Sequence, residues 1–141
     1  MNASDCIFCR IVAGDAPAHR VHEDAHTLSF MDAFPVTDGH TLVVTKAHAP
    51  TIFDASEAAL TAVAASARRV AHAIRATLAP DGLMVFQLNG AAAMQTVFHY
   101  HRHLMPRRDG EPLALHSRVP GDPARLAEIA AQLRAALART A

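Results

Sequence analysis

Three histidines occupy every second position of one short run near the middle of the C-terminal half. The run spans residues 95–106, and the histidines are His99, His101 and His103. Side chains of a β-strand point alternately to its two faces, so this spacing predicts a strand that places three imidazoles in one row on one side of a sheet. A packed core would use Val or Ile at such positions. Because imidazole changes protonation near neutral pH and also serves as nucleophile and metal ligand, we expect the function to lie in this row.

Length and charge limit the classes of protein to which the chain can belong. Its 141 residues fit one domain, residues 1–141, that can bury a substantial core. The 13 Lys and Arg balance the 13 Asp and Glu, so the charge favours neither a nucleic-acid partner nor a membrane surface. No apolar stretch approaches the roughly 20 residues of a membrane span, and the N-terminal residues do not have the pattern of a secretory signal. We expect a cytoplasmic protein.

Hydrophobic periodicity and turn residues predict an α+β fold. A stripe of apolar residues from Leu60 to Leu78 predicts a long amphipathic helix, with Asp54 as N-cap and Glu57 completing a capping box. A short helical turn is expected over residues 7–11, and Pro123 should open a C-terminal helix. The order of elements favours an antiparallel sheet of about five strands with the long helix on one face. The expected strands are residues 20–23, 27–31, 41–45, 83–88 and 97–105.

Cys6 and Cys9 form a Cys-x-x-Cys pair near the start of the chain. In a reducing compartment such a pair indicates a metal half-site or a redox pair before it indicates a structural disulfide. A thioredoxin-like pair would follow a strand and open a helix, and no strand is expected before Cys6. Redox chemistry is therefore the weaker interpretation.

The histidine row has three interpretations. Unrelated surface histidines are disfavoured by the strict period of two. A zinc site made by all three is disfavoured because strand rise separates the first and last by roughly 13 Å, although two of them could share an ion. In the third interpretation the histidines have three different roles, as nucleophile, phosphate donor and structural ligand.

The third interpretation agrees with a known family. The block from Gln95 to Arg107 closely resembles the signature of the histidine triad (HIT) nucleotide hydrolases and transferases. Together with the N-terminal part, the resemblance covers most of residues 5–108. It implies the HIT-like fold, a five-stranded antiparallel sheet with one long helix packed on it and a C-terminal helix, in a homodimer whose sheets join across the two-fold. The N-terminal segments that carry the resemblance are residues 6–11, 23–24, 30–32 and 39–48.

The resemblance implies covalent catalysis by His101. In the family the middle histidine attacks the α-phosphorus of a nucleotide, and water hydrolyses the nucleotidyl-histidine that forms. A neutral imidazole is a competent nucleophile at pH 7, and a covalent intermediate divides one difficult displacement into two steps. Charge that develops on phosphate oxygens needs donors nearby. The residues at the family positions that supply them are Asn89, Gln95, Thr96 and His103, although ordinary loop polarity also explains Gln95 and Thr96.

The same resemblance implies a nucleoside site. Asp32 shares a face of its strand with Phe30, and in the family this carboxylate takes the ribose hydroxyls. Phe8, Ile11, Phe30 and Ala33 match the positions that enclose the base. Each of these four is also an ordinary core candidate, so the interpretation depends on the surrounding motif. Ala33 is smaller than the Ile often found there, and we expect a looser contact with the purine.

Four residues have the ligand types of a Cys2His2 zinc site. Some HIT members similar to this chain carry zinc at the four positions. Such an ion would be structural, with its coordination closed, and would tie the N-terminal segment to the sheet. The alternative is a pair of buried free thiols and a turn histidine. The residues are Cys6, Cys9, His48 and His99.

Three features depart from the family pattern. Arg102 stands where a hydrophobic residue is usual and should point away from the imidazoles, toward a partner or the sheet edge. Met94 stands where many members have Gly. The loop from Asn89 to Gln95 is one residue shorter than in some relatives, which puts a phosphate contact by Asn89 in question. The other histidines, of which His40 is a candidate support for the triad, are interpreted as solvent or turn residues: His19, His22, His26, His40, His72 and His116.

The hypotheses differ in kind. The first is a hydrolase that cleaves purine nucleoside phosphoramidates or dinucleotide polyphosphates. The second is a non-catalytic module that binds a purine nucleotide or a protein partner, and the third is metal-dependent hydrolysis through two triad histidines. The leaving group is not specified by these motifs, because the family branches differ chiefly after Arg108.

Overall fold

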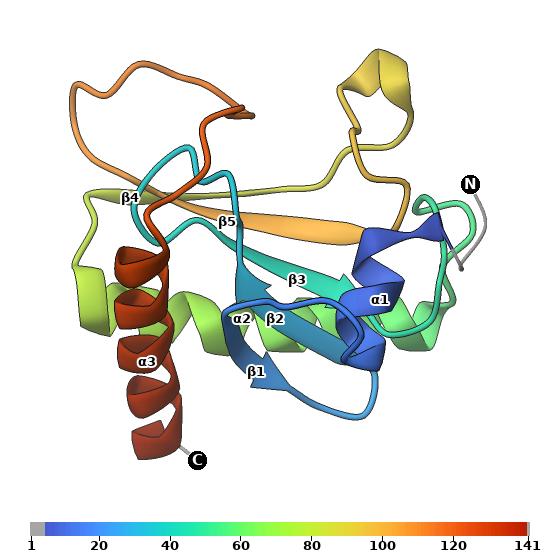
Figure 1. The fold of residues 1–141 in the computed structure, drawn as a ribbon, viewed down its shortest axis with the longest axis horizontal. Coiled ribbons are helices and arrows are strands. Elements are labelled where there is room, and N and C mark those ends of the chain that lie inside the picture. Colours follow the sequence, from blue (N-terminus) through green and yellow to red (C-terminus); the bar gives the residue numbers. More distant parts are fainter. Residues whose placement is uncertain (1–4, 141) are drawn as a thin grey trace.

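The computed structural model describes residues 5–140 and contains a five-stranded antiparallel sheet in the order β1-β2-β3-β5-β4 (Figure 1). The expected α+β class and the five strands are therefore confirmed. Strand β4 is at one edge of the sheet, and β5, which carries His101 and His103, is its inner neighbour. The strands are β1 (Arg20–Glu23), β2 (Thr27–Met31), β3 (Thr41–Thr45), β4 (Gly82–Phe86) and β5 (His101–Arg107).

Helices cover the sheet on both faces. The long helix α2 (Glu57–Leu78) and the C-terminal helix α3 (Pro123–Thr140) contact each other and the same strands. The short helix α1 (Ile7–Ala13) lies near the opposite end of the sheet from α3 (Figure 1). A single 3-10 turn, η2 (Ala91–Ala93), interrupts the loop between β4 and β5. None of the helices within residues 5–140 has the length and apolar character needed to cross a membrane.

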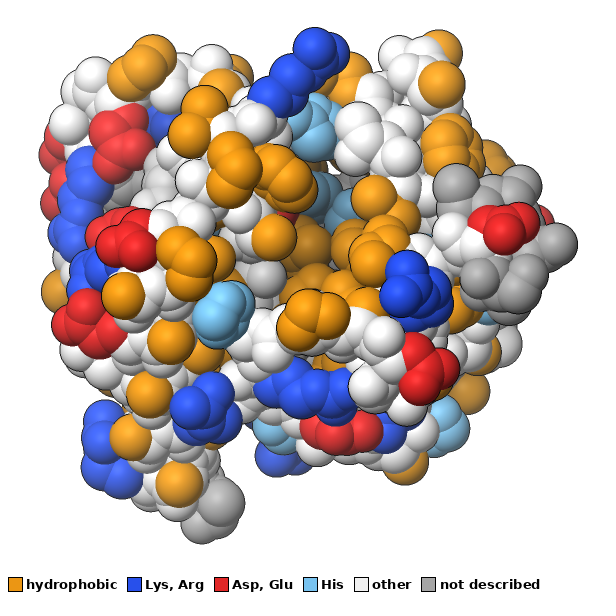
Figure 2. Space-filling view, viewed as in Figure 1, with side chains coloured by type: hydrophobic (Ala, Val, Ile, Leu, Met, Phe, Trp, Pro, Cys, Tyr) orange, Lys and Arg blue, Asp and Glu red, His pale blue; other side chains and the backbone are white. Residues whose placement is uncertain are grey.

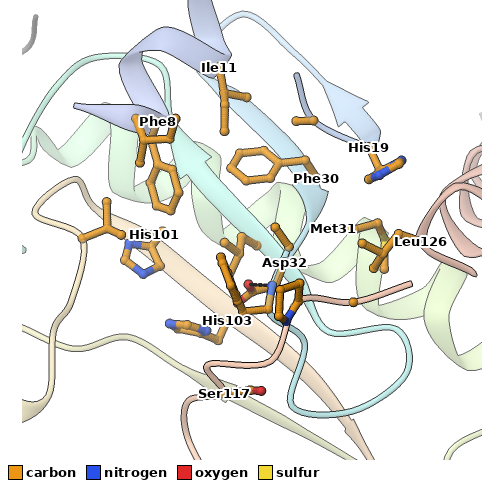
Figure 3. A pocket seen from close by; sticks show the side chains of 18 of the residues that line it. Phe8, Ile11, His19, Phe30, Met31, Asp32, His101, His103, Ser117 and Leu126 are labelled. Carbon is orange, nitrogen blue, oxygen red and sulfur yellow. Dashed lines mark hydrogen bonds between the residues drawn. The ribbon is translucent and has the colours of Figure 1, made fainter. Parts of the chain in front are cut away.

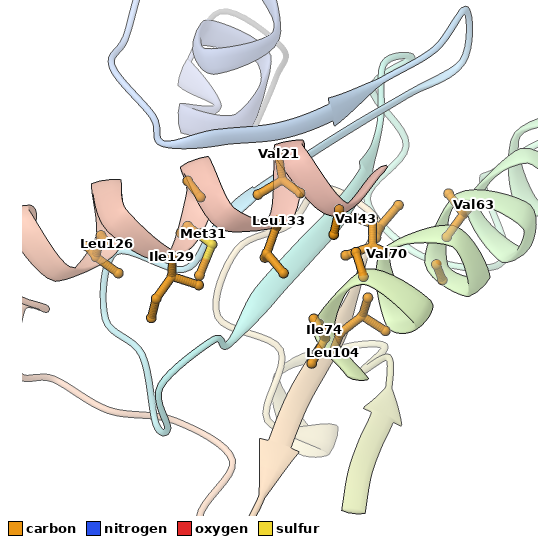
Figure 4. Close-up of a cluster of buried hydrophobic side chains, with 14 of the residues drawn as sticks. Val21, Met31, Val43, Val63, Val70, Ile74, Leu104, Leu126, Ile129 and Leu133 are labelled. Atoms are coloured by element: carbon orange, nitrogen blue, oxygen red, sulfur yellow. The ribbon is translucent and has the colours of Figure 1, made fainter. Parts of the chain in front are cut away.

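The two sheet faces carry separate hydrophobic clusters. Ile129 and Leu133 of α3 and Val70 of α2 meet Met31 and Val43 in the larger cluster (Figure 4). In the smaller cluster, Phe8 and Ile11 of α1 pack against the alternate residues of the same strands, which are Leu28, Phe30, Leu42 and Val44. Alternation along a strand explains this division, and it explains why every residue of β2 and β3 is buried.

Helix α2 begins two residues later than the expected capping box would place it. Ser56 is the N-cap, and its hydroxyl accepts a hydrogen bond from the Ala59 amide at 3.1 Å. The carboxylate of Asp54 instead accepts from the amide and the hydroxyl of Thr51, at 3.0 and 2.7 Å, in the preceding turn. The expectation of Asp54 as N-cap is wrong because this local turn competes for its side chain.

Strand β5 begins at His101, so the histidine row is shorter than expected. The ladder with β3 pairs His101 and His103 with Val44 and Leu42, whereas His99 precedes the strand. The amide of Tyr100 donates to the carbonyl of Ala49 at 2.7 Å, which fixes this stretch against the loop after β3. His99 is therefore free to turn its ring into a different environment.

The segment between β5 and α3, residues 108–122, has no helix or strand and arches over one end of the sheet (Figure 1). Arg107 holds its beginning by donating to the carbonyls of Glu111 and Pro112, at 2.7 and 3.0 Å. At its end, the amide of Gly121 donates to the carbonyl of Ala33 at 2.9 Å. A Cβ at Gly121 would lie 2.9 Å from the ring of Pro35, so only glycine permits this approach without displacement.

Candidate functional site

His101 is a buried imidazole with a defined tautomer. Its Nδ1 lies 2.6 Å from the carbonyl oxygen of His99. A carbonyl can only accept, so Nδ1 carries the proton and Nε2 keeps its lone pair. Burial is the largest cause that lowers the pKa of His101, to about 4, and the ring is therefore neutral at pH 7. An unprotonated Nε2 on a fixed ring is a suitable nucleophile.

The hydrogen bond from His40 determines which nitrogen of His103 carries the proton. The amide of Val36 donates to Nδ1 of His40 at 3.1 Å, so the proton of His40 is on Nε2. This Nε2–H donates to Nδ1 of His103 at 2.9 Å. The proton of His103 must then be on its Nε2, a buried atom with no hydrogen-bond partner among the described residues. Because buried donors are normally paired, this N–H is available for a ligand.

Both members of this pair stay neutral. Burial, and to a lesser extent the neighbouring imidazoles, lower the pKa of His40 to about 4 and that of His103 to about 2. The ring of His103 stacks on Phe86 of β4 with a centroid distance of 4.3 Å and an interplanar angle of 6°. The ring is thus held by one hydrogen bond and one stacking contact, and it acts as a hydrogen-bond donor rather than as a cation.

Asp32 lies just beyond β2 and close to the same pair. One of its carboxylate oxygens is 3.5 Å from Nε2 of His40, and the other accepts from the Phe34 amide at 2.9 Å. Burial raises the pKa of Asp32 to about 6. A half-buried carboxylate with spare acceptor capacity is suited to a ligand hydroxyl.

A second cluster lies beside α1. Its four ligand atoms, from Cys6, Cys9, His48 and His99, all lie within 4.8 Å of one another. The sulfur of Cys9 is 3.2 Å from Nδ1 of His48 and 3.4 Å from Nδ1 of His99, and the sulfur of Cys6 is 3.3 Å from the latter. Ligands of a tetrahedral Zn²⁺ are separated by about 3.3–3.8 Å, given bonds of 2.0–2.3 Å. The arrangement therefore fits a metal ion in size and in donor type.

The tautomer of His99 supports the same conclusion. Its Nε2 lies 2.6 Å from the carbonyl oxygen of Thr45 and so carries the proton. The lone pair on Nδ1 then faces the two sulfurs. Burial, with a hydrogen bond and charge from Cys6, raises the pKa of the Cys9 thiol to about 11, so a cation is needed to bring this thiol to the thiolate form near neutral pH.

A cavity of about 540 Å³ opens over the sheet in front of His101 and His103. Figure 2 shows it as a hollow surrounded by apolar side chains, with histidines at its floor. Its walls come from α1, the end of β2 and the segment before α3 (Figure 3). Phe8 packs edge-on against both Phe30 and His101, with centroid distances of 5.5 and 5.0 Å. The cavity thus joins an apolar slot to the two imidazoles.

Comparison with known proteins identifies the family. The model of the HIT domain matches residues 13–110. The chain belongs to the HIT domain family. The Protein hit of Bacillus subtilis is 43% identical over 105 residues, which are 74% of this chain and 72% of that protein. The HIT domain here thus has a bacterial relative of similar length.

Two further relatives bear on chemistry. A Zn-bound histidine triad family protein from Mycobacterium smegmatis has a crystal structure with a TM-score of 0.86 and 42% identity, covering 99% of this chain and 97% of that one. The adenylylsulfatase HINT3 of Arabidopsis thaliana is 33% identical over 110 residues, which are 78% of this chain and 56% of that protein. The described part of this HIT chain thus resembles a zinc-bound protein over nearly its whole length.

The structure brings most of the expected HIT site residues together. The cavity is lined by the candidates Phe8, Ile11, Phe30, Asp32, Ala33, Thr96, His101 and His103. Gln95 and Asn89 are not on its wall. The amide of Gln95 accepts from the Gly90 backbone at 2.7 Å and donates to the Pro50 carbonyl at 2.7 Å. Asn89 accepts from the Ile52 amide at 2.7 Å, so both side chains brace loops.

Sequence reasoning missed one wall of the cavity. His116, Ser117, Pro120 and Gly121 line it, and all four lie beyond the residues that match the HIT domain model. His19 and His116, which the sequence indicates as solvent or turn residues, are half-buried and line the cavity. Residues 108–122 have no periodic pattern, so only a three-dimensional structure could locate them. His40, expected as a support, contacts His103 directly.

Proposed function

We propose that this chain is a nucleotide hydrolase that cleaves purine nucleoside phosphoramidates or dinucleotide polyphosphates at the α-phosphate. The observation that carries the proposal is the unprotonated Nε2 of His101, on a ring that lines the cavity and whose Nδ1–H is held by a backbone carbonyl. The relative named an adenylylsulfatase supports a nucleotide substrate. The donor Nε2–H of His103 supports binding of an anionic group next to the nucleophile.

The proposed reaction has two displacements. Nε2 of His101 forms a bond to the α-phosphorus as the bond to the leaving group breaks, and the leaving group departs with the bonding electrons and takes up a proton. Water then attacks the same phosphorus, the N–P bond breaks, and the neutral imidazole is regenerated with release of a nucleoside monophosphate. Positioning and hydrogen-bond donors supply most of the catalysis of such a transfer. His103 and Thr96 are the donors that we assign to the phosphate oxygens.

The nucleoside would occupy the apolar slot. Phe8, Ile11, Phe30 and Ala33 form walls of the size and polarity that a purine needs, and Asp32 offers a carboxylate for the ribose hydroxyls. Asn89 and Gln95 would act by holding the loop that carries Thr96, since their side chains are hydrogen-bonded within that region.

We further propose that Cys6, Cys9, His48 and His99 hold a structural Zn²⁺. The distances within the cluster and the tautomer of His99 fit this ion, and a relative is zinc-bound. Closed four-fold coordination leaves no open position for a substrate. Its role would be to tie α1, which carries Phe8 and Ile11, to the chain just before β5. Reduced thiolates of this kind agree with a cytoplasmic location.

We also propose a homodimer that forms through the edge strand β4. Its outer side has no neighbour among the described strands, and Val85 is 49% exposed. An open edge with an exposed apolar residue readily pairs with another strand, and a second copy of the chain offers an identical one. Light scattering after size-exclusion chromatography tests this: Val85→Lys should shift the mass from two chains to one, whereas a monomeric wild type would contradict it.

The experiment that tests the function compares turnover with binding. Wild type should hydrolyse a fluorogenic adenosine phosphoramidate, and His101→Ala should lose turnover by a factor of about 10³ or more while binding adenosine monophosphate with near wild-type affinity. His26→Ala, at the exposed turn before β2, is the matched control. Binding by the wild type without cleavage of any such substrate would favour the non-catalytic module. Undiminished turnover in His101→Ala would refute the mechanism.

A further inference from the structure

The cavity has an unusual charge composition for a site that would bind a phosphate. Within residues 5–140, neither Lys nor Arg is among the residues that line it. A phosphate removed from water needs hydrogen-bond donors and a positive charge to replace its hydration. The ionisable groups on the wall are Asp32, His19, His101, His103 and His116.

The triad side of the cavity does not supply this charge. His103 and His40 are hydrogen-bonded to each other as a neutral donor and acceptor, and burial lowers both pKa values well below neutrality. Protonating either ring would also break the relay from the Val36 amide, because a charged imidazole has no acceptor nitrogen. These rings can therefore orient a phosphate but add no positive charge to it.

His116 is the remaining imidazole beside the triad. It is half-buried, and its ring lies perpendicular to that of His103, with a centroid distance of 6.2 Å and an interplanar angle of 87°. His19, by contrast, lies on the far side of Phe30 from His101 (Figure 3). A ligand oxygen that accepts from the free Nε2–H of His103 would thus bind next to His116 and not next to His19.

The backbone around His116 is anchored at both ends. Arg107 fixes the chain at Glu111 and Pro112, and the Gly121 amide is bonded to the loop after β2. Helix α3 continues the attachment, since Arg125 forms an ion pair of 2.9 Å with Asp38. The segment that carries His116 is therefore tethered on both sides of it, although it lies outside the residues that match the HIT domain model.

We propose that His116 is a positioning residue that binds a phosphate oxygen of the nucleotide beside His103 and supplies, as an imidazolium, the positive charge that the rest of the cavity lacks. The inference rests on the proposed function. The groups that face this position are His101 and His103 from β5 and His40 from the turn before β3. Asp32 and Ser117 line the same cavity.

Calorimetric titration of the full chain with adenosine monophosphate and with adenosine tests the proposal. In His116→Ala and His116→Gln the Kd for the monophosphate should rise about 10-fold, which is the loss of one charge-assisted hydrogen bond, while the Kd for adenosine should change less than about 2-fold. His116→Lys, which keeps a cation, should recover most of the affinity for the monophosphate. His26→Gln is the matched control at an exposed histidine, and circular dichroism reports whether each variant is folded.

The outcomes separate the two proposals. Wild-type affinity for the monophosphate in His116→Ala would overturn the inference, and so would an equal loss of affinity for adenosine, which would indicate a wall that only packs against the nucleoside. Failure of His116→Lys to recover more affinity than His116→Gln would refute the role of charge. Failure of the wild type to bind either ligand would refute the proposed function itself, and the inference with it.

Discussion

The Nδ1 of His101 lies 2.6 Å from the carbonyl oxygen of His99, whose own side chain turns toward Cys6 and Cys9. One residue thus orients the candidate nucleophile through its backbone and contributes a ligand to the candidate metal cluster through its side chain. The metal cluster and the cavity are thus two sites connected by the backbone at His99. The hydrogen bond from the Tyr100 amide to the Ala49 carbonyl holds this stretch of backbone in place.

Removal of the proposed zinc ion should destabilise the domain before it affects turnover. Chelation of the purified protein should lower the Tm by several degrees, because binding energy of a structural ion is folding energy. Differential scanning calorimetry with and without chelator, alongside initial rates at a temperature where the apo form is folded, provides the measurement. If chelation abolished turnover with an unchanged Tm, hydrolysis would be metal-dependent, as in the third hypothesis.

His40 should control the hydrogen-bond donor of His103. His40→Ala removes the N–H that holds Nδ1 of His103 and allows the proton to move to that atom. We expect kcat for the phosphoramidate to fall about 10- to 100-fold, as for loss of a group that holds a catalytic side chain in one tautomer. Steady-state kinetics with His22→Ala as control checks this. A change in KM alone, with kcat preserved, would contradict the relay.

Asp32 should weaken the fold at neutral pH. Its folded pKa of about 6 exceeds the ordinary value of 3.8, so the folded protein binds this proton more tightly than the unfolded chain does. The contribution of Asp32 to the free energy of unfolding therefore falls as pH rises from about 4 to about 6. At pH 7, Asp32→Asn should be more stable than wild type by about 1–3 kcal/mol.

Urea unfolding of both proteins at pH 7 and pH 4 measures this difference. The difference should become much smaller at pH 4, where the carboxyl is protonated in the folded protein and about half protonated in the unfolded chain. The depressed pKa values of His40 and His103 lower the stability of both proteins at this pH. A difference that stayed constant with pH would show that burial of the charge is not its cause.

Helix α2 ends in a conformation that favours glycine. Ala79 has φ of 45° and ψ of 54°, in the left-handed region, and Arg108 donates to the carbonyls of Leu78 and Ala79 at 2.6 Å each. Ala79→Gly should stabilise the protein by about 0.5–1 kcal/mol, because it removes the Cβ strain while the carbonyls stay bonded.

Ala65→Gly at an exposed position within α2 is the matched control and should destabilise by a similar amount. The free energy of unfolding in urea reports both. Destabilisation by Ala79→Gly would contradict the assignment of strain at the helix end.

The sequence was most informative where the residue type and the spacing each limit the alternatives. The period of two predicted that His101 and His103 share a face, and the apolar stripe predicted α2. The expected position of His99 within the strand was wrong, because the amide of the next residue, Tyr100, is bonded to Ala49, a contact between segments far apart in the chain. The expected N-cap of α2 was wrong because two residues that can cap a helix, Asp54 and Ser56, are close in sequence. The hydrogen bonds of Asp54 to Thr51 in the preceding turn leave Ser56 as the N-cap.

The wall formed by His116 could not be predicted at all. A histidine in an irregular segment has no periodic neighbours, and its place depends on the anchoring of Gly121 to Ala33 and on the packing of α3. Gln95 lies in the loop before the histidine strand, where the sequence indicates a phosphate donor. Its side-chain amide instead forms three hydrogen bonds with backbone groups of the folded loops, and these partners cannot be identified from the sequence.

Rapid-quench mass spectrometry during turnover of an adenosine phosphoramidate tests the central claim most directly. We expect a transient adduct with the mass of an adenylyl group, located by fragmentation on His101 and absent in His101→Ala. Turnover of the same substrate at full rate with no adduct at any quench time, or with the adduct on another residue, would contradict nucleophilic attack by this imidazole.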